Sequence, residues 1–247
     1  MKTKSLALTL SLFVLGACEK QPAPADTSLE DALDTISQEG LSAHLTYLAD
    51  GSLEAARAIA AAQPRRSVMF IGLAAEEKGL LGSDYFAHYP TVPSDSIVAN
   101  VNLDMPLFLF PVAELVGFGA EHSSLQAPMS AAAAAEGFVL APDPMPEENF
   151  FVRSDQYSFV KKGIPSSYLD VTLRSSDPDV DGEALVNDHL KNHYHKPSDD
   201  LSQSVDWSSA VRFARANARI GLAIANDDER PTWNEGDFFG EMFAPED

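Results

Sequence analysis

The stretch that decides the fold runs from residue 67 to residue 83 and reads Ser-Val-Met-Phe-Ile-Gly-Leu-Ala-Ala-Glu-Glu-Lys-Gly-Leu-Leu-Gly-Ser. Its first seven residues, 67–73, form an apolar run with the length of a buried strand. Two adjacent carboxylates, Glu76 and Glu77, follow this run, and residues 78–88 then show helical spacing of apolar side chains. Because ligands of α/β sheets bind beyond the carboxyl ends of strands, the two glutamates mark a candidate site.

Strand-like and helix-like segments alternate along the rest of the chain. Polar and acidic residues 174–187 are expected to form a surface loop. Strands that alternate with helices predict an α/β fold with a mostly parallel mixed sheet flanked by helices. The other expected strands are residues 97–103, 113–118 and a short one that ends at residue 169, and the other expected helices are residues 28–36, 41–49, 53–62, 123–137, 155–162 and 205–226.

The first residues have the pattern of a bacterial export signal. Lys2 and Lys4 precede an apolar stretch of ten residues, 6–15, which is too short to span a bilayer as a helix. Leu15-Gly16-Ala17-Cys18 then resembles a lipobox. The pattern predicts that residues 1–17 are a signal peptide and that Cys18 is lipidated, with an ordinary secretory signal as the alternative.

The residues after the lipobox predict a tether, one domain and an envelope location. Residues 18–27 are rich in Pro and Ala and are expected to be a flexible tether. Residues 28–247 are long enough for a single domain. Glu19 is typical of the sorting pattern of outer-membrane lipoproteins, so we expect a lipid anchor on the periplasmic face of the outer membrane.

The charge and cysteine content narrow the possible partners. The formal net charge is −20, and removal of Lys2 and Lys4 with the signal makes it about −22. Nucleic acid is excluded as a partner, because phosphate binding needs a basic face. No later segment is long and apolar enough to cross a membrane, so membrane contact is expected only through the anchor. Cys18 is the single cysteine, which excludes an internal disulfide.

Three segments together predict hydrolytic metal chemistry. The paired carboxylates Glu76 and Glu77 repel each other, so they need a nearby cation or a shared proton. Asp104 follows the expected strand 97–103, and His195 adds a fourth side chain suited to zinc chemistry. A metal would supply the cation, with one Glu as ligand and the other handling the proton of a bound water. The alternatives are a solvated helix start, a turn aspartate and a His-rich exposed loop.

Weaker candidates surround these residues. Tyr194 is either a donor to a developing oxyanion or a packing residue. Asp199 is a candidate to orient the ring of His195. Arg153 and Asp155 either line a pocket or belong to a helix start, where Asp is a common cap. The same tract contains His189 and His193, whose spacing of four residues would place them on one face of a helix. They are an alternative pair of metal ligands.

The combination of segments 66–83, 97–104, 153–159 and 194–199, with a tail at residues 233–240, is similar to the bacterial leucyl-aminopeptidase-like dizinc exopeptidases, family twenty-eight of the metallopeptidases. The resemblance implies a zinc-dependent aminopeptidase that hydrolyses N-terminal peptide bonds of a peptide substrate. It implies Glu76 as the general base and Tyr194 as the residue that stabilises the tetrahedral intermediate. It also implies that Glu77 and His195 bind one zinc ion and that Asp104 binds the other.

The chain departs from this family near Asp50-Gly51. A His-x-Asp segment and an Asn-Asp segment, which supply a zinc histidine and the bridging carboxylate, are missing there. A catalytic zinc usually has three protein ligands, so we expect at most one weakly bound metal and a sheet that lacks strands. The alternatives are a non-catalytic relic or binding lipoprotein that keeps the fold, and an error in the gene sequence around these codons. The sequence predicts no oligomeric state.

Overall fold

The computed structural model describes residues 28–38, 52–200 and 202–245. The predicted signal peptide with its Cys18, the tether, the helix at 41–49 and the Asp50-Gly51 junction lie outside these residues. Within the described parts of the chain, no helix combines the length and the apolar character needed to cross a membrane.

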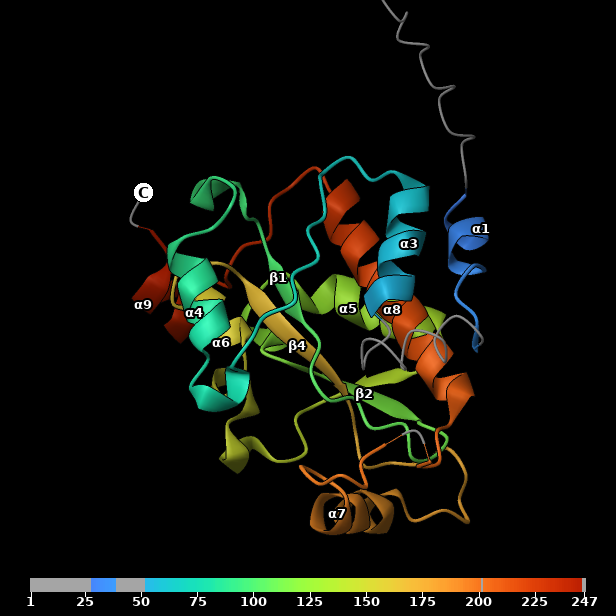
Figure 1. The fold of residues 1–247 in the computed structure, drawn as a ribbon. Helices are drawn as coiled ribbons and strands as arrows, with labels where there is room; N and C mark the ends of the chain where they lie inside the picture. Colours follow the sequence, from blue (N-terminus) through green and yellow to red (C-terminus); the bar gives the residue numbers. More distant parts are fainter. Residues whose placement is uncertain (1–27, 39–51, 201, 246–247) are drawn as a thin grey trace, which may run out of the picture.

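A four-stranded mixed sheet forms the centre of the fold (Figure 1). Its order is β1-β4-β2-β3, with parallel pairs β1/β4 and β2/β3 and an antiparallel pair β2/β4. Three of the expected strands therefore exist, and the predicted α/β class with a mostly parallel mixed sheet is confirmed. The strands are β1 Asn100–Asn102, β2 Glu114–Phe118, β3 Val139–Ala141 and β4 Ser166–Val171.

The expected strand at residues 67–73 is wrong. These residues form neither helix nor strand, and Met69, Phe70 and Ile71 are exposed by 46%, 48% and 38%. A strand needs a hydrogen-bonded neighbour, whereas β1 ends the sheet with only β4 beside it among the described strands. The apolar composition of residues 67–73 is therefore not enough to predict a strand of the sheet.

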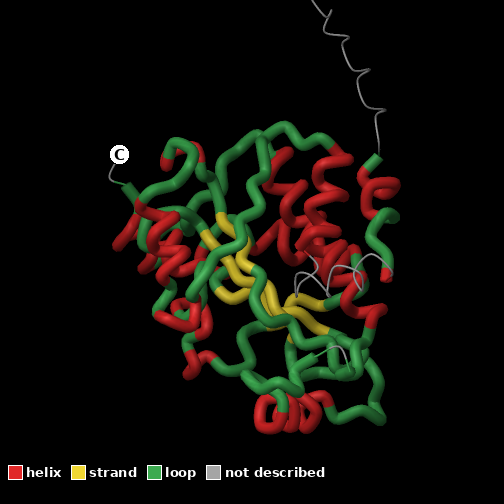
Figure 2. Tube along the Cα trace, viewed as in Figure 1, coloured by secondary structure: helices red, strands yellow, loops and turns green. Residues whose placement is uncertain are grey.

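Helices lie on both sides of the strands (Figures 1 and 2). In Figure 1, α3, α5 and α8 gather on one side, while α4, α6 and α9 gather on the other. The helices are α1 Leu29–Leu33, α3 Ser52–Ala62, α4 Leu81–His88, α5 Gln126–Ala135, α6 Gln156–Val160, α7 Gly182–Asn192, α8 Trp207–Asn226 and α9 Phe238–Phe243. Shorter 3-10 helices include η1 Glu76–Lys78, η4 Pro146–Glu148 and η5 Phe150–Val152.

The surface loop expected at residues 174–187 is wrong from Gly182 onward, where α7 begins. Asp181 caps this helix, because its Oδ1 accepts a hydrogen bond of 3.0 Å from the Ala184 N–H. Val186 and His189 lie buried on one face of α7. Because most residues of the segment are polar or acidic, the sequence did not reveal that one narrow face of it is buried.

Among the described residues, three apolar clusters fix the helices around the sheet, and two of them involve α8. The larger one joins the strands to α5 and α8, with Leu115, Leu169 and Ile220 fully buried. A second cluster packs α1 and α3 on α8 through alanines together with Leu33, Ile59 and Leu222. α8 therefore contributes to both clusters, which explains its ten buried residues over five and a half turns of helix.

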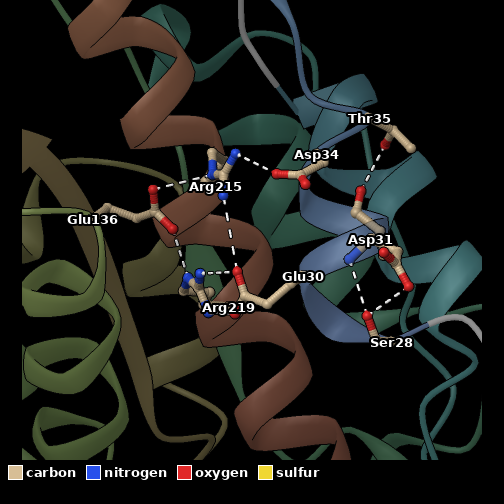
Figure 3. Close-up of polar contacts among 9 residues, drawn as sticks. Ser28, Glu30, Asp31, Asp34, Thr35, Glu136, Arg215 and Arg219 are labelled. Atoms are coloured by element: carbon tan, nitrogen blue, oxygen red, sulfur yellow. Dashed lines mark hydrogen bonds and ion pairs between the residues drawn. The ribbon is translucent and has the colours of Figure 1, made fainter.

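Ion pairs also hold α1 on α8 (Figure 3). Arg219 makes two hydrogen bonds of 3.0 Å to the carboxylate of Glu30, and Arg215 lies 3.2 Å from Asp34. Both arginines also contact the buried carboxylate of Glu136, at 2.6 Å from Arg219 and 3.1 Å from Arg215. The network thus ties the C-terminal end of α5 and the short α1 to the same face of α8.

Candidate acidic site beyond the sheet

The Glu76-Glu77 pair lies in a tight turn that leads into α4. Ala75 and Leu80 have left-handed backbone conformations, with φ of 61° and 60°. The N–H of Gly82 donates to the carbonyl of Ala74 at 2.9 Å, which closes the turn. A side chain at Gly82 would place its Cβ 2.4 Å from that same carbonyl oxygen. Glycine at this position is therefore what allows the turn to close beneath the two glutamates.

Glu77 contacts the histidine tract directly. The His195 Nε2 lies 2.7 Å from the Glu77 Oε1, and the Tyr194 hydroxyl donates to the same oxygen at 3.5 Å. The rings of Tyr194 and His195 stack with centroids 3.8 Å apart. His195 itself has a left-handed backbone, with φ of 57°. Residues far apart in sequence are thus gathered at one place.

Asp104 is oriented by a chain of hydrogen bonds. The Ser154 hydroxyl donates to Asp104 Oδ2 at 2.7 Å. The side-chain amide of Asn102 donates to Ser154 Oγ and to Gln156 Oε1, both at 3.0 Å. Gln156 in turn donates to the carbonyl of Phe151 at 2.8 Å. Ser154 Oγ thus accepts a hydrogen bond from the Asn102 amide and donates its own hydrogen to the carboxylate of Asp104.

Glu76 lies in the electrostatic field of the other acids. Burial, followed by the carboxylates of Asp104, Glu77 and Asp155, raises the pKa of Glu76. Burial, followed by Glu77 and Asp104, likewise raises the pKa of the Tyr194 hydroxyl. A carboxylate with a raised pKa is a better proton acceptor, and a phenol with a raised pKa stays a hydrogen-bond donor.

The sequence analysis missed two residues of this site, Tyr168 and Asp170 on β4. The Tyr168 hydroxyl lies 2.7 Å from the backbone oxygen of Asp104 and 2.9 Å from Asp170 Oδ2. Burial raises the pKa of Asp170 to about 7. The available signal was an aspartate at the carboxyl end of an expected strand, the same signal that identified Asp104.

The weaker candidates take other positions. Arg153 is exposed and pairs with Glu148 at 2.9 Å. Asp199 lies 3.7 Å from His189, so it does not orient His195 as predicted. Asp155 is the N-cap residue of α6 but makes no side-chain capping bond, and the residue is only 9% exposed. Asp155 thus belongs to a helix start, as one of the two alternatives predicted, but its carboxylate does not cap the helix.

The donor set fits a divalent cation in kind but does not form a complete ligand group. Carboxylates and an imidazole are suitable zinc ligands. Among the described residues, however, no three Asp, Glu, His or Cys side chains lie where they would hold one ion together. One buried oxygen, Asp155 Oδ1, has no hydrogen-bond partner. The described residues therefore do not form a complete metal site.

A cavity of about 480 Å³ lies apart from these acids, between the β2–β3 edge of the sheet and the start of α7. Its lining includes Glu114, Arg174 and Asp181 and none of the predicted site residues. Arg174 is already paired with Glu114 at 2.7 Å. The cavity therefore involves other residues than those predicted to form the site.

Comparison with known proteins places the chain in a family. No curated protein matches the sequence. Among solved structures, the chain is similar to an aminopeptidase from Aneurinibacillus sp. strain AM-1, with a TM-score of 0.49 and 21% identity over 73% of this chain and 38% of that one. The match thus spans less than two thirds of that aminopeptidase. The sequence profile of Peptidase family M28 matches residues 49–220, more than half of the chain. This chain therefore belongs to peptidase family M28.

Proposed function

We propose that this chain is a zinc-dependent exopeptidase of the aminopeptidase type, which hydrolyses the N-terminal bond of peptide substrates. Family membership supports a peptidase. The observation that carries the proposal is the position of Glu76, whose pKa is raised by burial and by Asp104, Glu77 and Asp155. A general base works best when its pKa lies closer to the working pH than that of an ordinary glutamate.

The side chains have distinct roles in this proposal. Glu76 accepts a proton from the attacking water and returns it to the leaving amine. The Tyr194 hydroxyl, held as a donor near Glu77, binds the oxyanion of the tetrahedral intermediate. Glu77 and His195 would hold one zinc ion and Asp104 would contribute to a second position. When bound, zinc would lower the pKa of the attacking water and polarise the substrate carbonyl.

Hydrolysis of leucine p-nitroanilide by the purified protein with added zinc tests this proposal. The variant Glu76→Gln removes the general base and is expected to lower kcat at least about 100-fold. The control Glu147→Gln makes the same chemical change in η4 and is expected to leave kcat unchanged. A wild-type protein that releases no p-nitroaniline, or a Glu76→Gln variant with wild-type kcat, contradicts the proposal.

The second candidate is a binding lipoprotein that keeps the fold without hydrolysis. Within the described parts of the chain, the absence of any group of three metal-binding side chains favours it. The two candidates differ in one measurement, because a binding protein retains peptides without releasing product. Equilibrium dialysis of a labelled tetrapeptide, followed by mass spectrometry of the peptide after incubation, distinguishes intact from shortened peptide.

The proposed location follows from the sequence, with residues 28–247 as one domain carried by the tether. Lipidation at Cys18 would anchor that domain at the periplasmic face of the outer membrane. Labelling with an alkyne fatty acid in a bacterial host is expected to mark the wild-type chain and not Cys18→Ser. Equal labelling of both chains would contradict the anchor.

A further inference from the structure

Residues 67–73 connect α3 to the turn before α4 and are fixed at both ends (Figure 1). At one end, the N–H of Arg66 donates to the carbonyl of Ala225 at 2.9 Å, and its side chain donates to the carbonyl of Ile224 at 2.8 Å. At the other end, the carbonyl of Ala74 accepts the hydrogen bond from Gly82 that closes the turn. Between these two ends, residues 67–75 contain no helix, turn or bend. The end of α8 and the start of α4 therefore hold a straight segment in place.

This segment has hydrogen-bonding groups and apolar side chains that the rest of the described chain does not use. Within residues 28–38, 52–200 and 202–245, no hydrogen bond joins the backbone of residues 67–73 to another residue. Met69, Phe70 and Ile71 are consecutive and exposed, so side chains on both faces of the segment lie open. A straight segment with unpaired backbone groups is a template for pairing with another strand.

The charges at the ends of the segment favour a second copy of this chain as the partner. Arg65 and Arg66 precede the segment, and Glu76 and Glu77 follow it. The side chain of Arg66 donates only to carbonyl groups, so its charge is not paired with a carboxylate. Two identical segments in antiparallel orientation bring the basic end of each copy near the acidic end of the other, whereas a parallel pair brings like charges together. The segment is thus complementary to itself, as a two-fold symmetric interface requires.

We propose that two copies of this chain associate through residues 67–73, which pair as an antiparallel two-stranded ribbon. The seven unpaired residues define the register, because all of them find partners only when Phe70 of one copy lies opposite Phe70 of the other. Ser67 of each copy then lies opposite Leu73 of the other. The ribbon covers the exposed apolar side chains and gives the free backbone groups their partners. The net charge of −20 on each copy opposes this association, and salt screens the repulsion.

Disulfide trapping tests the antiparallel register. Cys18→Ser removes the single natural thiol, and Ser67→Cys and Leu73→Cys are then introduced into separate chains. When the two variants are mixed and oxidised in 0.5 M NaCl, they are expected to form a linked dimer at least tenfold faster than either variant alone. In Ser67→Cys alone, the two thiols lie six residues apart along the ribbon, roughly 20 Å, which is beyond the reach of a disulfide.

Two further variants control the measurement. Ser94→Cys makes the same substitution in the exposed 3-10 helix η2, Ser94–Ser96, and its mixture with Leu73→Cys gives the rate of chance collision. If Leu73→Cys lowers Tm, Phe70→Cys replaces it, because that residue lies opposite itself and is expected to form the linked dimer alone. The proposal is overturned by equal rates for the mixture and for Ser67→Cys alone, by a mixture no faster than chance collision, or by a wild-type chain that stays monomeric in 0.5 M NaCl.

Discussion

Asp104 and Asp170 occupy equivalent places at the carboxyl ends of two neighbouring strands. Asn102 on β1 pairs with Tyr168 on β4, and each aspartate lies two residues further along the chain. The Tyr168 hydroxyl then contacts both residues. The parallel register of β1 and β4 therefore concentrates negative charge at this edge of the sheet. Repulsion from Asp104 contributes to the raised pKa of the partly buried Asp170 and of Glu76.

Asp170 is expected to make stability depend on pH. Its pKa rises from 3.8 to about 7 on folding. Between these values the folded chain keeps a proton that the unfolded chain has lost, so this contribution to stability falls as the pH rises from about 4 to about 7. In urea denaturation between pH 5 and pH 8, wild type is expected to lose about 2.5 kcal/mol more stability than Asp170→Asn.

A control is needed because other acids titrate in the same range. Asp95→Asn changes an exposed aspartate and is expected to show the wild-type dependence on pH. If Asp170→Asn and wild type lose the same stability between pH 5 and pH 8, Asp170 does not hold its proton in the folded protein.

Among the helices and strands, the sequence predicts those that depend on the local spacing of apolar residues. The helices at 123–137 and 205–226 contain α5 and α8, and the expected strand at 113–118 contains β2. The strand predicted at 67–73 is wrong because a strand needs a hydrogen-bonded partner elsewhere in the chain, and the spacing of apolar residues does not identify that partner. In the site, the sequence identified the meeting of Glu77 with His195, whereas Tyr168 and Asp170 required the register of β1 and β4.

The turn before α4 is expected to tolerate no side chain at Gly82. A Cβ there would lie 2.4 Å from the oxygen and 2.6 Å from the nitrogen of Ala74, and these backbone atoms move only with the turn itself. Gly82→Ala is therefore expected to destabilise the protein by about 1–3 kcal/mol, measured by urea denaturation. The control Gly72→Ala adds a Cβ with nothing within 4 Å and is expected to stay within about 0.5 kcal/mol of wild type. Equal stability of Gly82→Ala and wild type would show that the turn adapts.

The whole molecule combines a small sheet with a strongly acidic surface. β1 is an edge strand among the described residues, and the apolar segment 69–71 is exposed. Exposed edges and apolar patches promote association between copies. The net charge of −20 opposes association through repulsion, which salt screens. The balance between these two effects therefore depends on ionic strength.

Self-association is expected to increase with salt and to depend on Phe70. Light scattering after size-exclusion chromatography is expected to give a larger mean mass in 0.5 M NaCl than at low salt, because screening removes the repulsion that keeps copies apart. Phe70→Lys replaces an exposed ring with a charge and is expected to restore the low-salt mass without lowering Tm. Phe238→Lys makes the same change on α9, at a residue that is 62% exposed, and is expected to associate like wild type. If both variants behave alike, association depends on total charge, and the segment at 69–71 has no special part in it.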